Sequence, residues 1–116
     1  TVFFNFTKTV TSASTLYFDF RTRQSFSGAL TLRGQTSNLL SLRSTLTGSA
    51  ANLLLDSDSG SQTIDYLDVK DNDASGGQEL VCSTETEGCV DSGNTTNWFF
   101  GAINTIKKNW FHFFGF

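Results

Sequence analysis

A pattern of alternating apolar and polar residues recurs along the middle of the chain. It appears as FDFR at 18–21, LTLR at 30–33 and LSLR at 40–43, with starts 12 and then 10 residues apart. NLLLD at 52–56 and TIDYLDV at 63–69 continue the series, and turn-rich pieces such as DSDSGS separate the segments. Alternation with a period of two is typical of β-strands that bury one face. No convincing helical period precedes residue 100, so the body is predicted to be all-β.

Short strands at this spacing fit two architectures. One is a β-sandwich, and the other is a short right-handed β-helix in which each coil contributes two or three strands. In either fold the Arg that ends three of the segments is expected to stand in a row along one edge. Such a row discourages unwanted strand pairing, and a ligand-binding row is the alternative interpretation.

The length of 116 residues predicts a single domain, 1–116. Within it we expect an N-terminal strand segment 1–10, a β body 11–101 and an aromatic C-terminal tail 102–116.

Aromatic residues are concentrated at the two ends of the chain. Of 12 Phe, 2 Trp and 2 Tyr, eight lie within 98–116 and three within the first six residues. Burial of one Phe is worth about 1.5–3 kcal/mol, so we expect these rings to be covered. Read as a strand, NWFHFFGF at 109–116 is apolar on both faces, as in a strand buried on both sides. The rings predicted to form a subunit interface are Phe3, Phe4, Phe6, Trp110, Phe111, Phe113, Phe114 and Phe116.

Three arrangements of the two ends remain open. In the first, both ends pair within the core of their own domain. In the second, which is favoured, one end fills a groove or sheet edge on the next copy, and a head-to-tail contact of this kind makes a filament. In the third, residues 102–114 lie on a membrane as an interfacial helix, with Lys107 and Lys108 toward phosphates. A helix that spans a membrane is excluded, because no apolar run reaches about 18 residues.

Composition favours an extracellular location at the cell surface. Charged residues make up only 16% of the chain, and both Pro and Met are absent. This profile is typical of secreted β-proteins, and the missing Met suggests processing from a longer precursor. The net charge of −3 and the scattered basic residues argue against nucleic acid as a partner.

Two cysteines, Cys82 and Cys89, lie close together in the sequence. A zinc site needs two more ligands, and the only His is His112 in the distant tail. A disulfide is the simpler interpretation, worth roughly 2–3 kcal/mol, with two buried free thiols as the alternative. A disulfide implies an oxidising compartment. The sequons NFT at Asn5 and NTT at Asn94 are candidate glycosylation sites.

The loop DVKDNDASGG offers a candidate calcium site. Asp71, Asp73 and Ser75 stand at alternate positions before Gly76, as in the first half of an oxygen-donor calcium loop. The twelfth position is Cys82 where a bidentate Glu is expected, so a turn made by Asp, Asn and Gly is the alternative. No other cofactor is indicated. No nucleophile stands beside a base, so catalysis is not expected.

Residues 39–101 run from LLSLRSTLTG through QTIDYLDVKDNDASGGQ to DSGNTTNWFFG. This stretch resembles a β-rich module that recurs in large bacterial surface and secreted proteins, near right-handed β-helix or adhesin-like repeats. YLDVKDNDASGG and DSGNTTNW carry the likeness, which implies an architectural or adhesive part and brings no catalytic residues.

The predicted function is therefore a structural subunit of an extracellular filament or adhesive fibre. It would polymerise head to tail with copies of itself by donating an aromatic-rich terminal segment. A carbohydrate-binding β-module of a secreted or surface protein, with glycans as partners, is the alternative.

Overall fold

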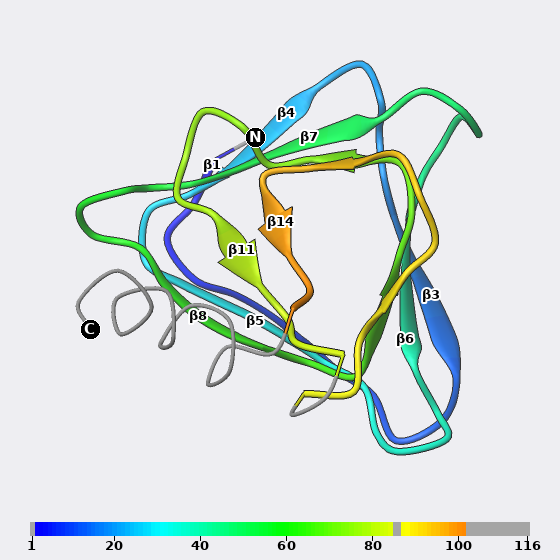
Figure 1. Cartoon of the computed structure of the whole chain (residues 1–116). Coiled ribbons are helices and arrows are strands. Elements are labelled where there is room, and N and C mark those ends of the chain that lie inside the picture. Colours follow the sequence, from blue (N-terminus) through cyan, green and yellow to red (C-terminus); the bar gives the residue numbers. More distant parts are fainter. Residues whose placement is uncertain (1, 85–86, 102–116) are drawn as a thin grey trace, which may run out of the picture.

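The computed structural model describes residues 2–84 and 87–101, and these wind into a short β-solenoid, or β-helix, of about 4 turns. In Figure 1 the coils lie over one another and enclose a roughly triangular interior. This part of the chain contains no helix, and therefore no helix that could cross a membrane. The strands are β1 (Val2–Phe3), β2 (Phe6–Thr9), β3 (Ser14–Phe18), β4 (Arg23–Phe26), β5 (Ala29–Arg33), β6 (Leu40–Ser44), β7 (Ala51–Leu55), β8 (Ser61–Asp65), β9 (Leu67–Val69), β10 (Asn72–Asp73), β11 (Leu80–Val81), β12 (Val90–Asp91), β13 (Thr95–Thr96) and β14 (Trp98–Phe99).

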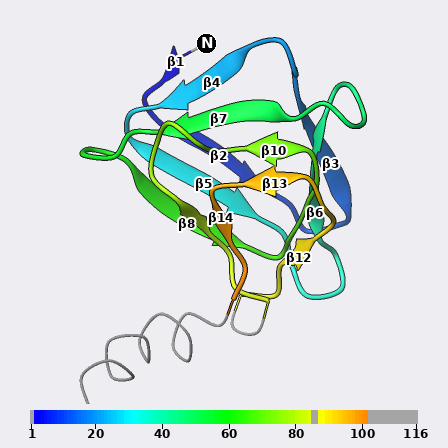
Figure 2. The ribbon, with the colours of Figure 1, turned by 45° about the horizontal axis from the view of Figure 1, so that its top comes forward.

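Strands of successive coils pair in parallel and form three faces (Figure 2). Face A is the sheet β1-β4-β7-β10-β13, and face C is the sheet β12-β9-β6-β3. Face B is the sheet β2-β5-β8, and the pair β11-β14 continues this side after an interruption. Every ladder thus joins two strands that are three places apart in the chain, which confirms the β-helix. The β-sandwich is discarded, because sandwiches are built from antiparallel pairs.

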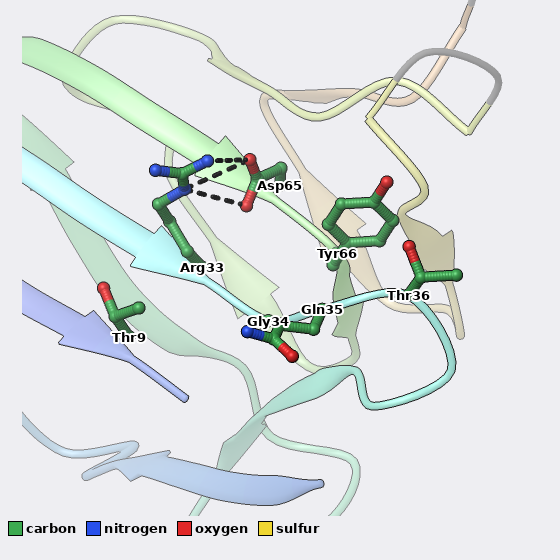
Figure 3. Close-up of a pocket in the computed structure, with 7 residues that line it drawn as sticks. All are labelled: Thr9, Arg33, Gly34, Gln35, Thr36, Asp65 and Tyr66. Atoms are coloured by element: carbon green, nitrogen blue, oxygen red, sulfur yellow. Dashed lines mark hydrogen bonds and ion pairs between the residues drawn. The ribbon is translucent and has the colours of Figure 1, made fainter. Parts of the chain in front are cut away.

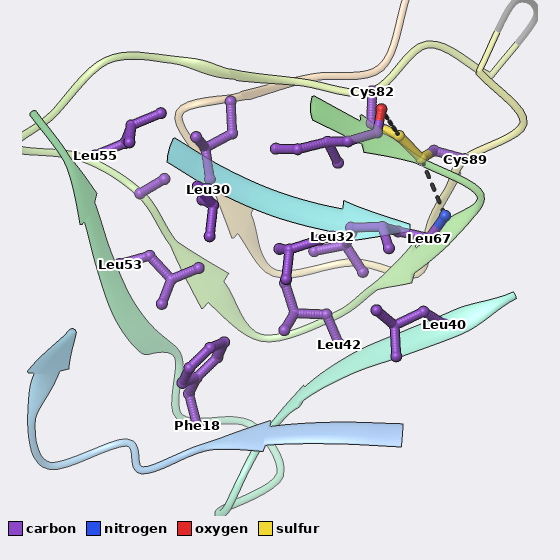
Figure 4. Close-up of a cluster of buried hydrophobic side chains, with 14 of the residues drawn as sticks. Phe18, Leu30, Leu32, Leu40, Leu42, Leu53, Leu55, Leu67, Cys82 and Cys89 are labelled. Carbon is purple, nitrogen blue, oxygen red and sulfur yellow. Dashed lines mark hydrogen bonds between the residues drawn. A yellow bond between two sulfur atoms is a disulfide. The ribbon is translucent and has the colours of Figure 1, made fainter. Parts of the chain in front are cut away.

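Leucine columns fill the interior (Figure 4). The register places Leu30 beside Phe6 of the coil before, and Leu42 beside Leu16 of one neighbouring coil and Val69 of the other. Every second residue of a strand points inward, and these apolar side chains stack on the equivalent side chains of the next coil. Each fully buried Leu contributes about 1.5–3 kcal/mol. The fully buried leucines are Leu30, Leu32, Leu40, Leu42, Leu53, Leu55, Leu67 and Leu80.

The alternating segments of the sequence correspond to strands, with one exception. LTLR lies in β5, LSLR in β6 and NLLLD in β7. FDFR does not form a strand, since β3 ends at Phe18 and the following residues turn. There the Asp19 carboxylate accepts the backbone N–H of Arg21 at 2.8 Å, which favours a turn over an extended backbone.

The predicted row of Arg residues is wrong. Arg33 lies on face B and Arg43 on face C, because the 10–12-residue spacing leads from one face to the next and not from one coil to the next. Each Arg instead pairs with an Asp. The ion pairs are Arg21–Asp19 at 3.1 Å, Arg33–Asp65 at 3.0 Å and Arg43–Asp68 at 3.3 Å.

Several corners between faces contain a residue in the left-handed region. TIDYLDV is divided into β8 and β9 by Tyr66, which has φ 53° and turns the chain from face B to face C. Asp71 and Asn94, both with φ 55°, stand at the corner that leads into face A in two successive coils. Asn and Asp tolerate this conformation better than other non-glycine residues.

Aromatic side chains lie near both ends of the described solenoid. Near the N-terminal end, Phe3 stacks on Phe26 at 5.6 Å between ring centroids, and Phe6 packs edge-on against both rings. Near the other end, Trp98 and Phe100 stack at 5.6 Å. Stacked rings therefore form part of the core at each of these ends.

Candidate functional sites

The predicted disulfide between Cys82 and Cys89 is confirmed (Figure 4). Both residues are buried, and their Cα atoms are 5.7 Å apart. The backbone N–H of Leu67 donates to Cys89 Sγ at 3.2 Å. The bridge therefore ties the loop after β11 to the corner between β8 and β9 in the coil before.

The candidate calcium residues are used in hydrogen bonds to the chain itself. Asp71 is buried; its Oδ2 accepts the N–H of Gly48 at 3.0 Å and its Oδ1 accepts Nδ2–H of Asn94 at 2.7 Å. These two bonds, in that order, are the largest causes that lower the pKa of Asp71. Asp73 Oδ1 accepts the N–H of Ser75 at 2.9 Å, which is the turn geometry named as the alternative.

Among residues 2–84 and 87–101, no group of three or more His, Cys, Asp or Glu side chains is arranged to hold a metal ion. Calcium binding stays a prediction.

Both sequon asparagines lie on the surface. Asn5 Oδ1 accepts the N–H of Ala29 at 2.8 Å, where it caps the β2–β5 ladder. Asn94 donates from Nδ2, the atom that a glycan would modify, to Asp71. Glycosylation at either site stays a prediction.

The predicted interface rings of the N-terminal segment lie in two environments. Phe3 and Phe6 are partly buried and pack against the core of their own chain, whereas Phe4 is 71% exposed. The strands that carry or flank them, β1, β2 and β3, each stand at the end of a sheet. The other predicted interface residues, Trp110, Phe111, Phe113, Phe114 and Phe116, lie outside the described residues, so the interface stays a prediction.

A polar pocket of about 420 Å³ lies where face B meets the corner to face C (Figure 3). At its rim Arg33 and Asp65 are register partners on β5 and β8. Arg33 donates to Asp65 from Nε at 3.2 Å and from Nη2 at 3.0 Å, and this pairing raises the pKa of the guanidinium. The pocket is lined by Thr9, Arg33, Gly34, Gln35, Thr36, Asp65 and Tyr66.

A second pocket of about 460 Å³ shares Asp65 with the first and lies where face B is interrupted between β8 and β11. Here a side chain replaces the missing ladder: Gln62 Oε1 accepts the N–H of Val81 at 2.8 Å, and its Nε2 donates to the carbonyl of Glu79 at 3.0 Å. The pocket is lined by Gln62, Thr63, Ile64, Asp65, Val81 and Glu87.

Sequence reasoning missed both pockets. Arg33 and Asp65 are 32 residues apart in the sequence, and only the coil register brings them together. One feature of the sequence could have indicated the first pocket: a charged residue ends two of the face B strands, Arg33 in β5 and Asp65 in β8.

No model of a known protein family matches this sequence, and neither a curated protein nor a solved structure matches it. The class that the structure itself defines is an all-β solenoid with one disulfide.

Proposed function

We propose that this protein is a structural subunit of an extracellular, adhesin-like fibre that assembles head to tail. The observation that carries the proposal is the N-terminal coil, whose outer edge no described strand covers. In β1, β2 and β3 every strand has a hydrogen-bonded neighbour on one side only among the described residues. An edge of this kind is a template for a further strand.

The inward side chains of this coil are covered on one side. Phe6 is partly buried, whereas its register partner in the next coil, Leu30, is fully buried. Leu16 is likewise partly buried beside the fully buried Leu42. One further layer of apolar side chains would bury these positions in the way that the inner coils bury theirs.

The backbone of β2 is also available to a further strand. The N–H of Val10 donates to the carbonyl of Arg33, so by alternation Thr7 and Thr9 direct their backbone groups away from β5. The same reasoning applies to β3, where the carbonyl of Phe18 accepts from Thr45. The residues whose backbone groups face the free edge are Val2, Thr7, Thr9, Thr15 and Tyr17.

The proposed occupant of this edge is the aromatic segment 102–116 of a neighbouring copy. Its sequence, with rings at alternating and adjacent positions, supplies apolar side chains to both faces of a donated strand. Because the donor and acceptor surfaces differ, the contact repeats without closing and gives a filament.

The test compares the intact chain with a chain that ends at Gly101 and with the variant Thr7→Pro, by sedimentation velocity and negative-stain microscopy. Thr7→Pro removes a donor from the free edge only, because Pro is tolerated where its nitrogen faces away from the ladder. Thr7→Val keeps the donor and is the matched control. We expect fibres from the intact chain and from Thr7→Val, and folded monomers from the other two.

Fibres that persist without residues 102–116 would show that another segment covers the edge. An intact chain that stays monomeric would overturn the assembly role altogether.

A further inference from the structure

The two pockets on face B form one surface of polar and apolar groups that runs along the solenoid axis. Thr9, Arg33 and Asp65 are register partners on successive coils, so they stand in a row parallel to the axis. The second pocket begins at Asp65 and continues to Val81 in the following coil. A ligand along this row would therefore contact four coils.

A second row of outward side chains follows the first. Thr7, Thr31 and Thr63 are register partners on β2, β5 and β8, and Thr63 also lines the second pocket. Hydroxyls that repeat from coil to coil offer both donors and acceptors to a ligand that repeats along the same direction.

Tyr66 adds a flat apolar surface. A Cβ atom on Gly88 would lie 2.5 Å from ring carbons of Tyr66, so the ring rests directly on the backbone of Gly88 and is held in place. In Figure 3 this ring stands between Asp65 and Thr36 at the side of the pocket. An aromatic face among convergent polar groups is the common composition of a small-ligand site.

The two pockets contain one ion pair and one further carboxylate. Asp65 is paired with Arg33, and Glu87 Oε1 accepts the N–H of Ser83 at 2.9 Å. Arg33 uses Nε and Nη2 toward Asp65, and Figure 3 shows Nη1 turned away from that carboxylate. Fixed donors and acceptors without a dominant charge suit a neutral ligand rich in hydroxyls.

We propose that this surface binds a neutral β-1,4-linked oligosaccharide that lies along the solenoid axis. Neighbouring coils are about 4.8 Å apart, and an extended β-1,4-linked chain advances by a similar distance per sugar. One sugar then lies beside each coil. The sugar at the first pocket places its C–H face on Tyr66, and the hydroxyls of the chain point toward Arg33, Gln35 and Thr63. This binding uses outward side chains, whereas the head-to-tail contact uses the backbone edge of the first coil.

The test is isothermal titration of the full chain with cellohexaose and xylohexaose. Two variants fill the surface with bulk at exposed positions, Thr36→Trp in the first pocket and Thr63→Trp in the second. Thr15→Trp, at an exposed position of face C, is the matched control. Thermal unfolding followed by circular dichroism checks that all three variants fold.

We expect binding of at least one of the two hexasaccharides, weakened about tenfold or more by Thr36→Trp and by Thr63→Trp and unchanged by Thr15→Trp. Cellobiose, which spans fewer coils, should bind more weakly than cellohexaose. Maltohexaose, whose α-linkages curve the chain, should not bind. The proposal is overturned if neither hexasaccharide binds, if maltohexaose binds equally well, or if all three variants lose binding alike.

Discussion

Asp71 joins three successive coils through one carboxylate. Its partners Gly48 and Asn94 are each 23 residues away, one before it and one after it in the sequence. Asp71→Asn keeps the volume and tolerates the φ of 55°, but its NH2 group replaces one acceptor oxygen and then faces a donor, either Gly48 N–H or Asn94 Nδ2–H. We expect a loss of about 1–3 kcal/mol in the free energy of unfolding at pH 7, measured with urea.

The same residue gives a pH dependence with a definite sign. The folded chain lowers the pKa of Asp71 below its ordinary value of 3.8, so its stabilisation is present above that value and is lost as the pH falls through the folded pKa. Urea unfolding should therefore show a smaller acid-induced loss in Asp71→Asn than in the wild type. Asp58→Asn, at an exposed position, should behave as the wild type; identical acid curves for all three proteins would contradict the role of Asp71.

Asn72 is fully buried and accepts Nε1–H of Trp98 at 2.9 Å, while its own Nδ2 has no partner among the described residues. Asn72→Ala leaves the indole N–H without that acceptor, and Trp98→Phe removes the donor. In a double-mutant cycle measured by urea unfolding, the combined loss should be smaller than the sum of the single losses by about 1 kcal/mol. Strict additivity would mean that the bond contributes nothing.

The sequence identified Asp71 but assigned it a different task. Oxygen donors at alternate positions are shared by calcium loops and by turns, and only the coil register shows that Gly48 and Asn94 lie over this carboxylate. The disulfide was predictable because the short separation of Cys82 and Cys89 leaves few alternatives. Side chains that meet across coils, such as Arg33 and Asp65, could not be paired without that register.

Two strands of face B, β8 and β11, are held together by a glutamine side chain. Gln62 accepts from Val81 and donates to Gln78 Oε1 at 2.8 Å and to the carbonyl of Glu79. Gln62→Glu keeps the shape and the acceptor but loses the donor, so two acceptors then face a carboxylate. We expect a loss of about 2–3 kcal/mol at pH 7, measured by urea unfolding and partly recovered near pH 4 as the new carboxyl protonates.

Gln35→Glu, at an exposed position, is the control for this substitution and should change the free energy of unfolding by less than about 0.5 kcal/mol. A loss that does not respond to pH would point to packing and not to the missing donor.

Strand positions were predictable from the sequence, but the stacking of strands was not. LTLR and LSLR alternate because one face of each strand is buried, and that holds in a sandwich and in a solenoid alike. The two folds differ in which strands pair. Loops of unequal length vary the number of residues per coil, so the coil period is not visible in the sequence. DSDSGS is one such loop, where Asp56 accepts the N–H of Ser59 at 2.7 Å.

At the scale of the whole molecule, the proposed fibre requires the free edge of the first coil to bind the segment 102–116, and a peptide experiment can measure this binding. The core residues of the described part of the chain all lie within 1–101, and we expect this shorter chain to fold. If the tail covers the free edge of the first coil, a labelled peptide of residues 102–116 should bind this truncated chain, as followed by fluorescence anisotropy. Thr7→Pro should abolish binding, because a donated strand needs the backbone donor that this substitution removes, whereas Thr7→Val should retain it.

A peptide with the same residues in scrambled order is the control for nonspecific binding through the aromatic rings. Equal binding of the native peptide to Thr7→Pro and Thr7→Val would place the tail elsewhere on the surface.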